Sequence, residues 1–145
     1  MKILISFLLF FVHLNIFAAG TYDTVDASKE YQKAENLINN KDFKSAIKVL
    51  KDLMSEDPNG YTKADLYNYL GFATRKQSNP DYELAEGYYL KALEININHV
   101  GALEYLGELY FETDRRDDAL ILLDRIKVFA GVNSSEYKSL KKLLN

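Results

Sequence analysis

Apolar residues recur three and four residues apart in successive segments of the chain, which is the spacing of one face of an α-helix. Short polar connections rich in Asn, Gly and Pro separate these segments, as in Asp57-Pro58-Asn59-Gly60 and Ser78-Asn79-Pro80. The pattern predicts first helices at 27–39, 64–77 and 99–113, and second helices at 42–55, 81–94 and 116–129. We therefore expect an all-α fold built from helix pairs. The fourth helix should be capped by Asn79, with Pro80 in its first turn.

A seventh helix is predicted at the C-terminus. Gly131 is typical of a helix end, and Asn133 followed by Glu136 three residues later is a helix-start signature. The apolar residues of this segment fall on one stripe and its lysines on another: Tyr137, Leu140, Leu143 and Leu144 against Lys138, Lys141 and Lys142. A helix that is apolar on one side only suits the end of a helical stack, so 133–144 is expected to be a capping helix.

The helix pairs form an internal repeat. Three small residues each precede an alanine by a similar distance: Ala34 and Ala46, Gly71 and Ala85, Gly107 and Ala119. The second alanines lie 39 and then 34 residues apart, a period typical of stacked helical repeats. The sequence therefore predicts an α-solenoid of three pairs and a cap.

These repeats resemble the tetratricopeptide repeat family, whose pattern is W-x2-L-G-x2-Y, then A-x3-F, then P. The third unit matches as Leu103-x2-Leu106-Gly107-x2-Tyr110 with Ala119-x3-Leu123, and the second as Tyr67-x2-Leu70-Gly71-x2-Thr74 with Ala85-x3-Tyr89. The first unit is degenerate, and the resemblance covers about residues 27–130. It implies repeats near 27–60, 64–97 and 100–131, followed by the capping helix, within a domain of residues 21–145. It also implies that Gly107 lies where the second helix of its pair crosses the first.

Composition fits one soluble folded domain. The chain has 145 residues, of which 48% are hydrophobic and 27% charged, and its net charge is −3. Such a balance offers no basic face for nucleic acid, so a nucleic-acid partner is not expected. The absence of cysteine excludes disulfides and thiol chemistry.

Residues 1–20 differ from the rest of the chain. Lys2 precedes an apolar stretch that ends in the small residues Ala18, Ala19 and Gly20, which are the parts of a secretory signal peptide. This pattern predicts export, to the periplasm of a Gram-negative bacterium, with cleavage after one of those three residues. An uncleaved inner-membrane anchor is the alternative, but the run is shorter than a membrane span and contains Ser6, His13 and Asn15.

The resemblance also places the candidate site. In such solenoids the first helices make a concave groove, and the positions beside the core-facing ones would line it. These positions are Tyr31, Glu35, Asp65, Asn68, Phe72, Arg75, Glu104, Glu108 and Phe111. Aromatic residues among carboxylates, with one arginine, suit a protein or peptide that carries a basic segment. Glu104 and Glu108, four residues apart, are expected to project side by side into the groove.

Catalytic and cofactor sites find little support in the sequence. His99 is the only histidine after the predicted signal peptide and is expected in a surface turn, and no Cys or His cluster could bind a metal. No glycine-rich loop has the spacing of a phosphate site. We therefore expect no cofactor and no enzymatic activity. The predicted function is a protein-binding scaffold in the cell envelope. The alternative is a self-associating component, in contact through residues such as Tyr61 and Tyr88, or a membrane-tethered one.

Overall fold

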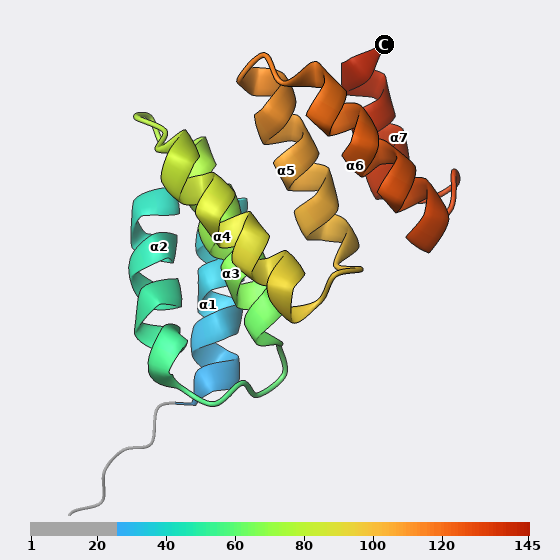
Figure 1. Ribbon diagram of the computed structural model, residues 1–145. Coiled ribbons are helices and arrows are strands. Elements are labelled where there is room, and N and C mark those ends of the chain that lie inside the picture. Colours follow the sequence, from blue (N-terminus) through green and yellow to red (C-terminus); the bar gives the residue numbers. More distant parts are fainter. Residues whose placement is uncertain (1–25) are drawn as a thin grey trace, which may run out of the picture.

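The computed structural model describes residues 26–145, which form seven α-helices and no strand. The helices are α1 (Ala27–Asn39), α2 (Phe43–Asp52), α3 (Lys63–Lys76), α4 (Tyr82–Ile95), α5 (Val100–Glu112), α6 (Arg116–Phe129) and α7 (Ser135–Leu144) (Figure 1). A short 3-10 turn, η1 (Leu53–Ser55), extends α2. The predicted all-α solenoid is confirmed. Every helix end lies within two residues of the range that apolar spacing predicts, except that α2 ends at Asp52 and η1 continues to the predicted end at 55.

Polar side chains fix where the helices begin. Asp26, Asp42 and Asp81 accept hydrogen bonds from backbone N–H groups in the first turns of α1, α2 and α4. Thr62 and Asp65 form a reciprocal capping box at the start of α3. The expectation that Asn79 caps the fourth helix is wrong by two residues: Asp81 takes that role, and Pro80 precedes the helix instead of lying in its first turn.

The helices stack in chain order (Figure 1). The pairs α1–α2, α3–α4 and α5–α6 pack within themselves, α2 packs on α3, and α4 packs on α5. The last helix, α7, packs on both α5 and α6 and covers the end of the stack. Its start is capped by Ser134 rather than Asn133, and its Leu140 and Leu144 are buried. The apolar side of the last pair is therefore closed by the helix expected to do so.

Two glycines allow helices to approach closely, but against different partners. A Cβ on Gly71 would lie 2.6 Å from Cε1 of Tyr89, so this glycine permits the crossing of α3 and α4, as the repeat implies. A Cβ on Gly107 would lie 2.5 Å from Cδ2 of Leu140. The expectation that Gly107 lies at the crossing of α5 and α6 is thus wrong. On this side of α5 the neighbour is α7, whose Leu140 occupies the space that the missing side chain leaves.

Candidate protein-binding groove

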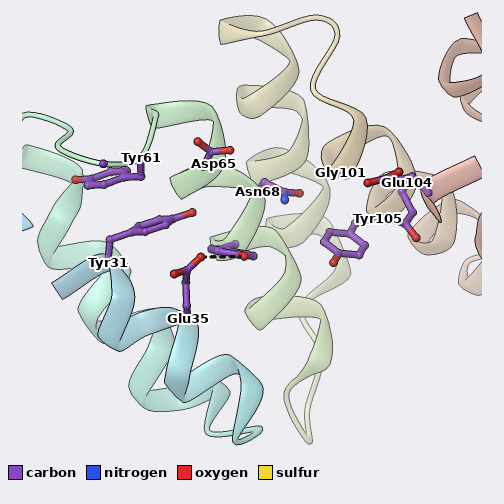
Figure 2. A pocket seen from close by; sticks show the side chains of 11 residues that line it. Tyr31, Glu35, Tyr61, Asp65, Asn68, Gly101, Glu104 and Tyr105 are labelled. Carbon is purple, nitrogen blue, oxygen red and sulfur yellow. Dashed lines mark hydrogen bonds between the residues drawn. The ribbon is translucent and has the colours of Figure 1, made fainter. Parts of the chain in front are cut away.

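Side chains from the odd-numbered helices enclose a recess with a volume of about 310 Å³ (Figure 2). Its walls come from α1, the loop before α3, α3, α5 and α7. We call it the tyrosine recess; its lining residues are Tyr31, Glu35, Gly60, Tyr61, Asp65, Asn68, Tyr69, Gly101, Glu104, Tyr105 and Glu136. Four tyrosines and four carboxylates share this space, and none of the lining residues is basic.

The tyrosines form a neutral aromatic wall. The rings of Tyr31 and Tyr61 stack with centroids 4.3 Å apart and planes 4° from parallel, and Tyr69 lies 5.7 Å from Tyr31 on its other side. Burial, reinforced by the charge of Glu35, raises the pKa of Tyr69 to about 12. The Tyr69 hydroxyl therefore stays protonated at neutral pH, and it donates a hydrogen bond to Oε1 of Glu35 at 3.3 Å.

Three carboxylates of the recess have no basic partner. Within residues 26–145, no Lys, Arg or His forms an ion pair with Glu35, Glu104 or Glu136. Glu104 is only 9% exposed. Burial, followed by the nearby charge of Glu108, raises the pKa of Glu104 to about 7. The recess thus holds acidic groups, one of them strained electrostatically, that the protein itself leaves uncompensated.

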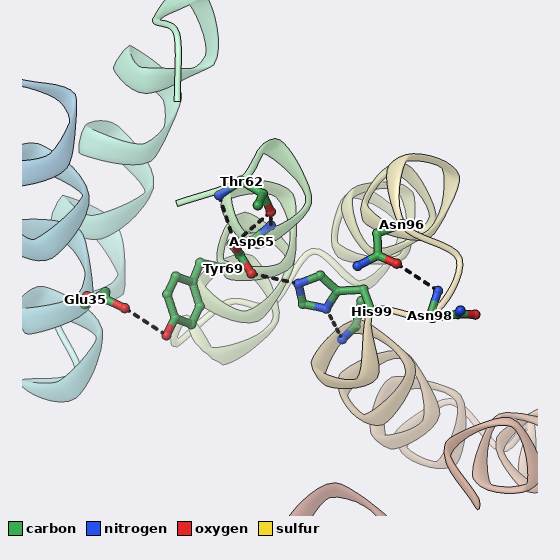
Figure 3. Close-up of polar contacts among 8 residues, drawn as sticks. Glu35, Thr62, Asp65, Tyr69, Asn96, Asn98 and His99 are labelled. Carbon is green, nitrogen blue, oxygen red and sulfur yellow. Dashed lines mark hydrogen bonds and ion pairs between the residues drawn. The ribbon is translucent and has the colours of Figure 1, made fainter. Parts of the chain in front are cut away.

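The fourth carboxylate, Asp65, belongs to the scaffold. Its Oδ2 accepts from the backbone N–H and the hydroxyl of Thr62 at 2.8 and 2.7 Å, and its Oδ1 lies 3.0 Å from Nε2 of His99 (Figure 3). Partial burial raises the pKa of Asp65, but the hydrogen bonds from Thr62 and His99 outweigh it and the pKa is lowered overall.

His99 joins two repeats rather than lying in a surface turn. Its Nδ1 accepts the backbone N–H of Ala102 at 3.1 Å, which caps α5. An accepting Nδ1 leaves the proton on Nε2, which donates to Asp65 on α3 (Figure 3). With its side chain 12% exposed, His99 is a structural link, and the expectation of a surface residue is wrong.

Two buried polar groups in the recess lack partners. Asn68 is 6% exposed and its Oδ1 accepts no hydrogen bond, and Tyr61 is 8% exposed with a hydroxyl that forms none. Among buried polar atoms of folded proteins such cases are few, and each calls for an explanation. Both residues belong to the lining, so the unmet hydrogen bonds lie at the recess wall.

At the other end of the groove, the charged side chains pair with one another. Arg75 is 2% exposed, and its guanidinium binds Glu108 at 2.5 Å and Glu112 at 3.0 Å. We call these three residues the arginine cluster. Phe72 packs on Tyr105, with ring centroids 4.8 Å apart, and Phe111 is half-buried against the C-terminal core. Arg75 is therefore engaged inside the protein, and Glu108 does not project freely beside Glu104.

Five of the nine residues expected in the groove line the recess: Tyr31, Glu35, Asp65, Asn68 and Glu104. Tyr69 and Tyr105, which the sequence reasoning omitted, also line it. Each lies two residues before the glycine of its repeat, so an aromatic residue at the same register in two units was a usable signal. Glu136 was missed because it belongs to the capping helix, outside the repeat.

Residues 26–145 contain neither a metal-binding cluster nor a membrane-spanning helix. No three Asp, Glu, His or Cys side chains of residues 26–145 lie close enough together to hold a metal ion. Over the same residues, none of the helices combines the length and the apolar character needed to span a membrane.

Comparison with curated proteins finds partial relatives, and no family model matches the chain. It is 30% identical over 86 residues to "Tetratricopeptide repeat protein 37" of Xenopus laevis, which covers 59% of this chain and 5% of that protein. It is 32% identical over 92 residues to "Uncharacterized protein ycf37" of Porphyra purpurea, covering 63% of this chain and 52% of that protein. The protein of the same name from Pyropia yezoensis is 36% identical over 81 residues, covering 56% and 44%. The chain thus spans about half, or much less, of the length of these relatives.

Solved structures match the fold over most of the chain. The crystal structure of MamA superposes with a TM-score of 0.68 at 19% identity, covering 83% of this chain and 68% of that one. The structure of PcrH in complex with the chaperone binding region of PopB gives 0.66 at 18% identity, covering 81% and 90%. At such identities the likeness concerns the fold.

Proposed function

We propose that this chain, which has the fold of tetratricopeptide repeat proteins, acts as a non-enzymatic scaffold that binds a basic segment of a partner protein in the tyrosine recess. The observation that carries this proposal is the composition of the recess, in which aromatic rings and three carboxylates without basic partners meet and no basic side chain is present. Such a surface attracts a cationic segment and repels an anionic one. The accessible surface of the recess is mainly polar, so the attraction is expected to be chiefly electrostatic.

A protein of the same fold gives this proposal support. The PcrH structure contains a region of another protein, PopB, bound to a chain that superposes on 81% of this one. The likeness supports a protein or peptide as the class of partner. The basic character of the segment is inferred from the recess of this chain alone.

Selection of peptides from a random display library on the full chain would test the proposal. We expect selected peptides to be enriched in Lys and Arg. Their binding should weaken tenfold or more, about 1.4 kcal/mol, in the double variant Glu35→Lys with Glu104→Lys. Glu108 is left unchanged, because its reversal would break the ion pair with Arg75 and confound binding with stability. Binding should also weaken between roughly 0.05 and 0.5 M salt.

The matched control reverses two exposed carboxylates that line neither the recess nor the hollow beside Phe129, Asp52 at the end of α2 and Glu83 on α4. This control changes the net charge by the same amount and should leave the affinity nearly unchanged. Peptides without basic enrichment, or equal affinity for both double variants, would contradict the proposal.

A second function, self-association, is favoured by an apolar surface on α6 and around it. Ile121 is 60% exposed, Val128 77% and Ile97 65%, and Phe129 lines a hollow of about 550 Å³ beside α4. The residues first expected at such a contact are not available, because Tyr61 and Tyr88 are 8% and 7% exposed. Light scattering of the full chain tests this function: a dimer that becomes a monomer in Val128→Lys would support it, and a monomeric parent would reject it.

We further propose that the protein is exported to the cell envelope. The support is the signal-like pattern of residues 1–20, which lie outside the described residues. N-terminal sequencing of the protein from periplasmic extract should find a start between Ala19 and Thr21. An intact N-terminus in the membrane fraction would instead favour a membrane-tethered assembly component.

A further inference from the structure

We propose that the tyrosine recess is a binding site for the primary ammonium group of a single lysine side chain. This inference rests on the proposed function and specifies which chemical group of the partner enters the recess. Four kinds of observation carry it: the origin of the carboxylates, the unmet hydrogen bonds, the aromatic wall, and the way in which this protein holds an arginine elsewhere.

The carboxylates surround the recess from different helices. Glu35 comes from α1, Glu104 from α5 and Glu136 from α7, and none has a basic partner within residues 26–145. A single ammonium group in the recess would offset one of these negative charges and lower the electrostatic repulsion among them. It would relieve most of all the buried Glu104, which has the least access to water among them.

The groups of the recess that lack hydrogen-bond partners can accept a hydrogen bond from a ligand. Oδ1 of Asn68 is an acceptor without a partner, and the Tyr61 hydroxyl oxygen can accept as well as donate. An ammonium group has three N–H donors and no acceptor, so it can donate to up to three of the acceptors that line the recess. This second observation is independent of the charges and points to the same class of ligand.

The aromatic wall can contact the cation of a lysine side chain. Tyr31 and Tyr61 are buried and stacked on one another, whereas Tyr69 beside them is partly exposed, and such a ring can hold a cation. Gly101 keeps the wall on α5 open, because a Cβ there would lie 3.3 Å from Nδ2 of Asn68. The accessible surface of the recess is mainly polar, which suits the charged end of a lysine side chain.

The arginine cluster shows how the same protein binds a guanidinium. Arg75 uses two nitrogen atoms on two carboxylates of one helix, Glu108 and Glu112, which lie one turn apart. A planar guanidinium is matched by such neighbouring acceptors, whereas a compact ammonium can point its donors in several directions. The recess has dispersed carboxylates from three helices, and no three acidic groups of the described chain lie close enough together for a metal ion. Lysine fits this arrangement better than arginine or a bare divalent cation.

The test is an NMR titration of the full chain with blocked seven-residue peptides of Gly and Ser that differ only at a central Lys, Nε-acetyl-lysine or Arg. We expect the lysine peptide to shift the Gly101 amide and the Asn68 side-chain amide. The arginine peptide should bind at least threefold more weakly, and the acetylated peptide should not saturate at about 10 mM. Glu104→Gln should weaken the lysine peptide at least fivefold. Glu83→Gln on α4, which removes the same charge elsewhere, should not change it.

Several outcomes would overturn the inference. These are equal binding of the acetylated peptide, tighter binding of the arginine peptide, shifts confined to residues outside the recess, and no shift from the lysine peptide up to about 10 mM. They are distinguishable from failure of the proposed function. If library peptides lose affinity in the Glu35 and Glu104 reversal but keep it when each lysine is replaced, the groove binds a partner and the ammonium site is wrong.

Discussion

Glu104 and Glu108 lie one turn apart on α5, yet their surroundings differ. Glu108 faces α3, where Arg75 binds it, whereas Glu104 faces the tyrosine recess, where no basic residue of the described chain reaches it. In the arginine cluster the protein neutralises its own acidic groups and ties two repeats together. In the tyrosine recess the acidic side chains have no basic partner among the described residues and remain available to a ligand. One acidic face can therefore serve stability at one end and binding at the other, depending on what the preceding repeat presents.

The largest effect on stability is expected from replacement of Arg75 in the arginine cluster. Arg75→Met leaves Glu108 without a basic partner and Glu112 with Lys76 alone, and we expect it to lower the free energy of unfolding by about 3 kcal/mol. Urea denaturation would measure the loss. The control is Arg115→Met, which removes surface ion pairs with Glu86 and Asp118 and should cost about 1 kcal/mol or less. Equal losses in the two variants would show that the cluster contributes no more than a surface pair.

A smaller loss is expected at the contact that places α7 against α5. Gly107→Leu would collide with the buried Leu140 and push α7 away, which should cost about 1–3 kcal/mol and move Glu136 away from the recess. Thermal unfolding measures the cost. Gly87→Leu is the matched control, because a Cβ at Gly87 meets nothing within 4 Å and a helix interior favours leucine over glycine. If both variants unfold like the parent, the close approach of α7 has no energetic importance.

Glu104 and Glu108 should respond in opposite directions to neutralisation. Burial raises the pKa of Glu104 from 4.5 to about 7, so the folded protein holds a proton that the unfolded chain releases within that range. The stability of the parent therefore falls as pH rises from 4.5 to about 7 through this group. We expect Glu104→Gln to be about 1–3 kcal/mol more stable than the parent at pH 8 and equal to it near pH 4.5.

Glu108→Gln is the counterpart at the arginine cluster. It should lower stability by about 1–2 kcal/mol at pH 8, because a charge-assisted hydrogen bond to Arg75 is lost. Urea denaturation at both pH values would measure the two variants together. Changes of the same sign at pH 8 would remove the distinction between the two ends of the groove.

The smallest effect is expected inside the recess. Tyr69→Phe removes the hydrogen bond to Glu35 but keeps the ring beside Tyr31, so stability should change by about 0.5–1 kcal/mol. Affinity for the lysine peptide should change less than in Glu104→Gln, since the carboxylate of Glu35 stays. A loss of stability as large as that of Arg75→Met would show that the recess is a structural core rather than a binding surface.

The sequence alone predicts the helices well because apolar spacing and breakers are local signals. It predicts the Gly71 crossing for the same reason, since Tyr89 belongs to the same repeat. It fails at Gly107 because the neighbour there is the capping helix, which breaks the repeat that the prediction extends. Helix boundaries depend on the residues of one segment. The packing partner of a residue in the last repeat depends instead on the segment that follows the repeat.

The candidate site could be predicted in part for a related reason. Helical periodicity places Glu35, Asp65 and Glu104 on one side of the stack, and all three line the recess. It also places Arg75 beside them, but it cannot show that a charged residue is buried, because burial depends on acidic side chains 33 and 37 residues further along the chain. Sequence reasoning therefore located the acidic surface and missed which of its charges were already paired.

The recess is assembled from every second helix, with α1 at one end of the stack and α7 at the other (Figure 1). In a linear array the terminal units open most easily, so fraying of either end would dismantle the recess while the middle pair stays folded. A ligand in contact with α1, α5 and α7 would stabilise both terminal helices against opening. At a hundredfold excess over its Kd it would add about 2.7 kcal/mol against opening. Amide hydrogen exchange in α1 and α7, the two helices farthest apart in the chain, should therefore become slower when the ligand is bound.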